Sequence, residues 1–233
     1  MTQYLNKCTY TSATKMSELV LQDYRYLLTL KRFGIPLGFG NQTIAEVCQS
    51  AGADTDTFLL VVNTLAEPAQ TESFPLEAIN VPLVMAYLKN THTYFIHYRL
   101  PKLHVMLREL IKGADELHGS LLLEFFEKYE TEVCRHMEYE EKYVYPYVIN
   151  RYEGKDSGPH TIDYYESHHN DIEKKLNDLR NIIIKYLPPL KDTDQMNDLL
   201  IALFQSEEDL NRHTFIEEHI VFPAVRYYES KNE

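Results

Sequence analysis

The sequence predicts an all-α protein, in which an up-down-up-down four-helix bundle follows a small helical domain. In residues 81–233, four long segments carry apolar residues at every third or fourth position, and none alternates apolar and polar residues as a strand does. Residues 14–66 contain shorter helical patterns, and residues 67–75 are polar with two prolines. We therefore expect an N-terminal domain in residues 1–66, a linker in 67–80 and the bundle in 81–233.

The N-terminal part has recognisable helix starts and stops. Residues 15–33 form one amphipathic pattern, and residues 34–41 are a turn rich in glycine with a proline. Thr43 is followed three residues later by a glutamate, which predicts a capping box at the start of the next helix. Residues 51–54 then end that helix and cap another that contains residues 58–65.

Polar residues interrupt the apolar stripes of the bundle segments. His136 and Glu140 lie in the second stripe, His169 in the third, and His213 and Glu217 in the fourth. A buried carboxylate costs several kcal/mol unless it is paired or binds a metal. These positions therefore favour a metal centre inside the bundle.

A repeated string supports the same interpretation. HMEYEEKYVYPYV in residues 136–148 returns as HTFIEEHIVFPAV in residues 213–225. In each copy the histidine and the first glutamate are four residues apart, so both lie on one helix face. Imidazole and carboxylate ligands without a thiolate suit iron, manganese or zinc, and bridging carboxylates favour a pair of irons. Glu140 and Glu217 are the expected bridges.

More ordinary interpretations remain open for some of these residues. A single His–Glu pair is more often a buried histidine hydrogen-bonded to a glutamate, although two copies with His169 favour the metal. Four tyrosines near the site could each donate a hydrogen bond to a metal-bound ligand or simply fill the core: Tyr139, Tyr143, Tyr145 and Tyr147.

The two HxxxEE strings that end in Tyr-Pro or Phe-Pro, together with His169 in SHHND, resemble the hemerythrin-like (HHE cation-binding) domain. With a small domain in front, the chain is similar to the iron–sulfur cluster repair di-iron family known as ScdA, YtfE or RIC, from about residue 15 to residue 228. The resemblance implies two iron ions, bridged by Glu140 and Glu217, and ligands at His136, Glu140, His169, His213 and Glu217. Glu141 and Glu218, which follow the ligand carboxylates, would support the ligands or face solvent.

The first bundle segment departs from the family pattern. The family places a histidine seven residues before the leucine of a Leu-Pro pair, here Leu100, and that position is Thr93. His92 is one residue early but lies in the apolar stripe, so we expect it to be the ligand, with His97 as the alternative. A further family ligand lies before the second helix, and His118 is its candidate.

The N-terminal domain departs further. The family usually carries adjacent cysteines in a turn of the form GIxFCCGG, whereas Gly38 and Phe39 stand at those positions here. We therefore expect this domain to dock or dimerise instead of reacting.

Composition excludes some classes of partner. The formal net charge of −12 argues against nucleic acid and anionic membranes. We find no signal peptide and no apolar stretch that reaches the roughly 18 residues of a spanning helix. Three widely spaced cysteines, Cys8, Cys48 and Cys134, do not form a disulfide framework. The cytoplasm is the expected location.

The resemblance implies a function. It describes a cytoplasmic di-iron protein that repairs or protects iron–sulfur clusters under nitrosative or oxidative stress. Its partners would be damaged iron–sulfur proteins and O2 or NO, and a homodimer is possible. One alternative is a non-catalytic sensor or carrier that binds O2 or NO reversibly at its di-iron site. Another is a bundle that binds no metal and acts through protein contacts.

Overall fold

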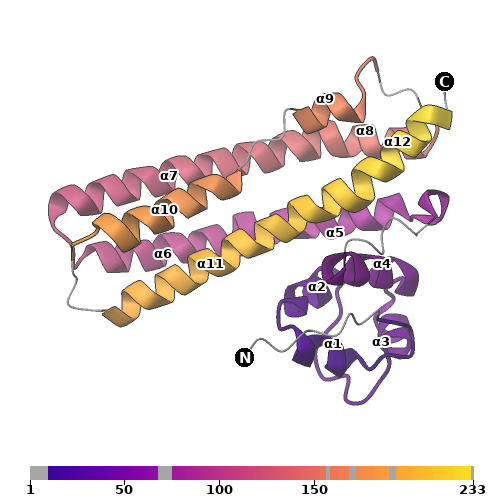
Figure 1. Ribbon diagram of the computed structural model, residues 1–233, viewed down its shortest axis with the longest axis horizontal. Coiled ribbons are helices and arrows are strands. Elements are labelled where there is room, and N and C mark those ends of the chain that lie inside the picture. Colours follow the sequence, from indigo (N-terminus) through magenta and orange to yellow (C-terminus); the bar gives the residue numbers. More distant parts are fainter. Residues whose placement is uncertain (1–9, 68–74, 156–157, 168–171, 189–192, 232–233) are drawn as a thin grey trace. The chain divides into compact units, whose positions relative to one another are not determined.

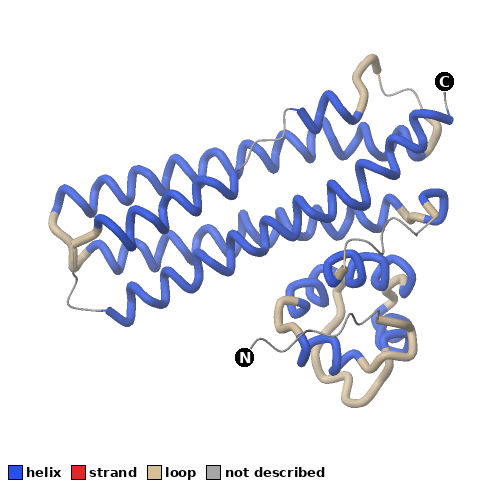
Figure 2. Tube along the Cα trace, in the orientation of Figure 1, coloured by secondary structure: helices blue, strands red, loops and turns tan. Residues whose placement is uncertain are grey.

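The computed structural model describes the chain except for residues 1–9, 68–74, 156–157, 168–171, 189–192 and 232–233. In the described parts every regular element is helical, as Figure 2 shows, so the predicted all-α fold is confirmed. The elements of the N-terminal part are α1 (Met16–Gln22), α2 (Tyr26–Arg32), α3 (Ile44–Ala51), α4 (Thr55–Ala66) and the 3-10 turn η2 (Leu76–Ala78). The later ones are α5 (Val81–Tyr94), η3 (Phe95–Arg99), α6 (Leu100–Ile111), α7 (Glu116–Tyr139), η4 (Glu140–Val144), α8 (Tyr145–Tyr152), α9 (Ile162–Ser167), α10 (Ile172–Tyr186), α11 (Thr193–Ile216), η5 (Glu217–Val221) and α12 (Phe222–Lys231).

Helices α1–α4 enclose a core of their own (Figure 1), whose fully buried residues include Met16, Ile44 and Phe58. The predicted capping box is present, because the Thr43 side chain accepts from the Glu46 amide while the Glu46 carboxylate accepts from the Thr43 amide. Gly52 ends α3 with a φ of 68°, a left-handed conformation that glycine adopts without strain. Local capping thus sets the bounds of α3.

The prediction of one helix across residues 15–33 is wrong. The chain leaves the helical conformation at Asp23, which has a φ of −146°. The Asp23 carboxylate accepts from both the backbone amide and the Nε of Arg25, at 2.9 and 2.7 Å. Such a local side-chain hydrogen bond competes with the helix, which explains why α1 and α2 are separate.

The chain forms two compact units, the first made of Met1–Asn90, Tyr147–Ile162 and His213–Glu233, the second of Thr91–Pro146 and Asp163–Arg212. In the first unit, the Glu229 carboxylate accepts hydrogen bonds from the Tyr147 hydroxyl and the Ile162 amide, which tie α12 to α8 and to the start of α9. The predicted linker at residues 67–80 stays a prediction, since residues 68–74 lie outside the described parts.

The second unit is the four-helix bundle. Figure 1 shows α6, α7, α10 and α11 running alongside one another, with successive helices in opposite directions. Their apolar stripes meet in one core, whose buried members include Leu103, Phe126, Leu179 and Leu203. Fully burying a side chain of this size contributes roughly 1.5–3 kcal/mol, so this shared core holds the four helices together.

Three of the long helices contain a π-helical turn, namely η3, η4 and η5. Each turn is followed by one residue and then a proline: Pro101, Pro146 and Pro223. A proline inside a helix has no N–H for the carbonyl four residues earlier, and its ring crowds that carbonyl. In each case that carbonyl lies inside the π turn, where the wider spacing relieves the clash.

Among the described residues, no helix combines the length and the apolar composition that a membrane crossing requires.

Candidate metal centre

Glu140 is a buried carboxylate that faces two imidazoles. It begins η4, and about 2% of its surface is exposed. One oxygen, Oε1, lies 3.0 Å from Nε2 of His136, and the other, Oε2, lies 3.1 Å from Nε2 of His92. His136 is one helical turn earlier in α7, between the buried residues Val133 and Met137, whereas His92 comes from α5 and is fully buried. Each carboxylate oxygen thus has its own histidine.

These separations match a shared ion. Two ligand atoms that are each about 2.1 Å from one metal and at right angles lie about 3.0 Å apart. An ionised carboxylate offers only electron pairs, as does an imidazole nitrogen that carries no proton. Two such atoms 3.1 Å apart, as in His92 and Glu140, favour a cation between them.

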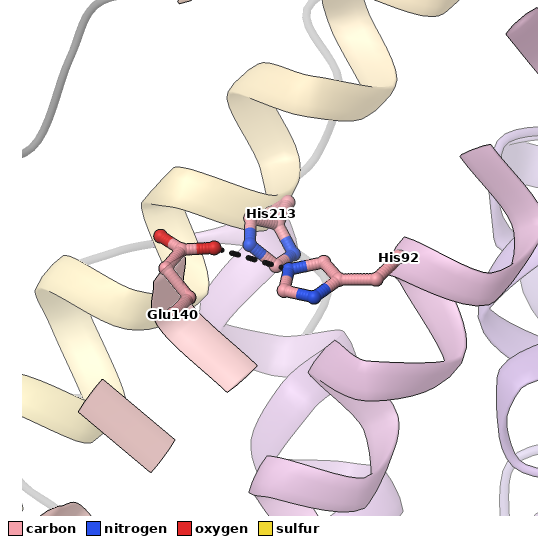
Figure 3. A group of neighbouring side chains, drawn as sticks. All are labelled: His92, Glu140 and His213. Atoms are coloured by element: carbon pink, nitrogen blue, oxygen red, sulfur yellow. Dashed lines mark ion pairs between the residues drawn. The ribbon is translucent and has the colours of Figure 1, made fainter. Parts of the chain in front are cut away.

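The second copy of the motif repeats the first. His213 in α11 and Glu217, which begins η5, are both buried, and Nε2 of the histidine lies 3.3 Å from Oε1 of the glutamate. His92, Glu140 and His213 each offer one ligand atom, and these atoms all lie within 4.8 Å of one another. Figure 3 shows these three side chains pointing toward one another from three different helices.

The π turn η3 explains the irregular position of His92. This histidine is eight residues before Leu100, one more than the spacing expected from the resemblance. Turn η3 occupies residues in that interval, and a π-helical turn holds about one residue more than an α-helical turn. The additional residue is therefore taken up between His92 and Leu100. The sequence carried no signal for this additional residue, because the Leu-Pro pair that follows belongs to the family pattern as well.

His92 has two further partners in the same unit. Its Nδ1 lies 3.1 Å from Oε1 of Glu141, and its Nε2 lies 3.0 Å from the hydroxyl of Tyr145. The Tyr145 ring also stacks on the imidazole, with ring centroids 5.3 Å apart and an interplanar angle of 20°. The ring of His92 is thus held on both edges and on one face.

The other tyrosines considered from the sequence have different surroundings. Tyr147 donates to Glu229, and burial together with this hydrogen bond raises its pKa to about 12. Burial is also the main cause of a raised pKa at Tyr139, to which Tyr164 and Tyr165 contribute. Tyr143 is about half exposed. Tyr145 is the candidate for a role beside the ligands.

Some predicted ligands lie elsewhere. His97, the alternative in the first helix, is in η3 and is exposed. His118 is in the first turn of α7, and 18 residues of continuous helix separate it from His136, a distance of about 27 Å. Its Nδ1 contacts Asp115, the N-cap of α7, at 2.7 Å. The structure therefore does not bring His118 to Glu140. His169 lies outside the described residues.

The donor set fits iron. The residues gathered around Glu140 and Glu217 supply imidazole nitrogens and carboxylate oxygens, and no thiolate belongs to the group His92, Glu140 and His213. Such ligands suit first-row metals including iron.

Comparisons with known proteins identify a cation-binding domain in this chain. A model of the hemerythrin HHE cation-binding domain matches residues 89–225. The iron–sulfur cluster repair protein ScdA of Staphylococcus haemolyticus (strain JCSC1435) is 21% identical over 187 residues, which cover 78% of this chain and 84% of that relative.

Proposed function

The chain belongs to the hemerythrin HHE cation-binding family, and we propose that it is a di-iron protein that repairs or protects iron–sulfur clusters under nitrosative or oxidative stress. The repair activity is the one that the name of its relative ScdA states. In this proposal the irons are bound by His92, His136, Glu140, His213 and Glu217, with His169 as a further ligand.

The observation that carries the proposal is the position of Glu140. Its two oxygens face two different imidazoles at 3.0 and 3.1 Å, so one carboxylate can bridge two ions, each of which also has a histidine. In the second copy of the motif, one oxygen of Glu217 lies 3.3 Å from Nε2 of His213. A buried carboxylate of this kind is expensive without a cation, which favours metal over a purely structural role.

The protein's own contribution is to keep these groups oriented and shielded from water. The neighbours of His136 in α7 are the buried residues Val133 and Met137, and these side chains exclude water from that side. The Tyr145 hydroxyl lies 3.0 Å from Nε2 of His92, where it can donate a hydrogen bond. Bound iron would supply a reversible redox change and a position for a small diatomic ligand such as O2 or NO.

A sensor or carrier of O2 or NO is the second candidate. It is favoured because this chain lacks the adjacent cysteines that the ScdA, YtfE or RIC family usually carries in one turn of the N-terminal domain. Here Gly38 has a φ of 102°, a conformation that side chains rarely adopt, and Phe39 follows it. No thiol chemistry can come from these two positions.

The first experiment is iron content with an optical spectrum on protein purified anaerobically. The native chain should bind two irons, and His136→Ala and Glu217→Ala should each lose iron because each removes a donor. Glu218→Ala is the matched control, because Glu218 directly follows the proposed ligand Glu217 in the chain but has an exposed side chain. An iron-free native chain, or a full complement in both ligand variants, would refute the assignment.

A second experiment separates repair from carriage. A repair protein restores activity to an enzyme whose iron–sulfur cluster has been nitrosylated, whereas a carrier shows only a reversible spectral change with O2 or NO. Repair through this centre is supported if the native chain restores the enzyme's activity and His136→Ala does not. The homodimer and the cytoplasmic location stay predictions, which gel filtration and cell fractionation test.

A further inference from the structure

His92 is held between two consecutive carboxylates. Glu140 lies 3.1 Å from its Nε2, and Glu141 lies 3.1 Å from its Nδ1. The two glutamates are adjacent in sequence at the start of η4, so this turn presents a carboxylate to each edge of one imidazole. The histidine is fully buried, and the Glu141 side chain is 32% exposed.

The contact with Glu141 favours one tautomer of a neutral His92 ring. An ionised carboxylate only accepts, so Nδ1 must carry the proton that it donates to Glu141. In a neutral imidazole Nε2 then has a lone pair, which accepts from the Tyr145 hydroxyl at 3.0 Å. Nε2 is also the nitrogen that faces Glu140, and the proposed iron would bind to this lone pair in place of the Tyr145 hydrogen bond. The tautomer that Glu141 selects is therefore the one that can bind metal.

The two copies of the motif are not equivalent in this respect. Both contain two consecutive glutamates, Glu140-Glu141 and Glu217-Glu218. Glu141 reaches a buried histidine on another helix, whereas Glu218 is exposed. An identical sequence feature thus supplies both a candidate and its matched control.

We infer that Glu141 is a positioning residue, which holds His92 in the tautomer and orientation that bind iron, and that Glu218 has no corresponding role. This inference rests on the proposed function, because it assigns His92 as an iron ligand. Carboxylates that accept the second N–H of a ligand histidine orient the ring and raise its basicity. Only the iron bound by His92 should depend on Glu141.

The test is an anaerobic titration of the iron-free protein with ferrous iron alone, on the native chain, Glu141→Gln, Glu141→Ala and Glu218→Ala. Glu141→Ala should raise the dissociation constant of one iron equivalent between roughly 10- and 100-fold. Glu141→Gln keeps an acceptor oxygen without the charge, so its loss should be smaller. Glu218→Ala should titrate as the native chain does. Circular dichroism of each variant confirms that the helices are retained.

Proton NMR of the iron-loaded protein supplies a readout that general destabilisation does not move. The Nδ1 proton of His92 should give an exchangeable, iron-shifted resonance that moves in Glu141→Gln and is lost to fast exchange in Glu141→Ala. Native affinity and an unchanged resonance in Glu141→Ala, or equal losses in Glu218→Ala, overturn the inference while the di-iron proposal stands. A native chain that binds no iron overturns both.

Discussion

The position of His92 allows a direct test against His97, the other histidine considered in the first bundle helix. His92 is fully buried and forms a pair with Glu140 at 3.1 Å, whereas His97 is exposed in the following π turn. We predict that His92→Ala lowers both iron content and the stability of the iron-free protein. His97→Ala should change neither.

The structure indicates the size of the effect on stability. Removing the fully buried His92 ring takes a hydrogen-bond partner from both Glu141 and Tyr145, and the loss of such a buried partner costs about 1–3 kcal/mol. Two partners are affected at a fully buried position, so the upper value of about 3 kcal/mol is expected here. In a chain of 233 residues each kcal/mol shifts the melting temperature by roughly 2–4 °C. His92→Ala should therefore melt roughly 6–12 °C lower, and His97→Ala within roughly 2 °C of the native protein.

Both variants are compared with the native protein by calorimetry after removal of iron with a chelator, and then by iron content after reconstitution. The assignment of His92 as the ligand is refuted if His97→Ala loses iron while His92→Ala keeps it. The expected difference in stability is refuted if the two variants melt at the same temperature, since their different burial would then have no energetic consequence.

Three further predictions concern single groups. Tyr145→Phe keeps the ring that stacks on His92 but removes its hydroxyl, so urea unfolding of the iron-free protein should show a loss of about 1 kcal/mol. Burial raises the pKa of the Cys48 thiol from 9.0 to about 11. The contribution of this protonated thiol to the free energy of unfolding is therefore fully present below pH 9 and is lost as the pH rises through 11. The same thiol should resist alkylation at pH 8 in the native protein and react after unfolding, as peptide mapping will show. Thr43→Ala removes the side-chain acceptor of the capping box at α3, which costs about 1 kcal/mol, so amide exchange in that helix should be roughly fivefold faster.

Contacts between residues close in the chain were predictable. The capping box at Thr43 and the left-handed glycine that ends α3 depend on side chains within a few residues of the helix ends. The pairing of His136 with Glu140 follows from helix geometry alone, because residues four apart lie on the same face. The break at Asp23, although local, was missed because a residue of moderate helix propensity also fits an amphipathic pattern.

The π turns were only partly predictable from the sequence. A proline two residues beyond each turn is visible in the sequence, but the sequence alone does not say whether the helix ends, kinks or widens there. The core around Phe126 and Leu203 keeps the helix continuous across the bundle, so a wider turn is the outcome. His92 consequently reaches Glu140 in spite of its irregular spacing from Leu100.

By itself the sequence determined the helical class, the apolar stripes and the two His–Glu pairs, because all of these follow from periodicity along one helix. Only the tertiary structure decided that His92 meets Glu140, that Glu141 contacts His92 across 49 residues of chain, and that His118 lies a whole helix away from His136. These relations depend on how far each helix is rotated and shifted against its neighbour. That geometry is set by the packing of the whole core, which no short stretch of residues encodes.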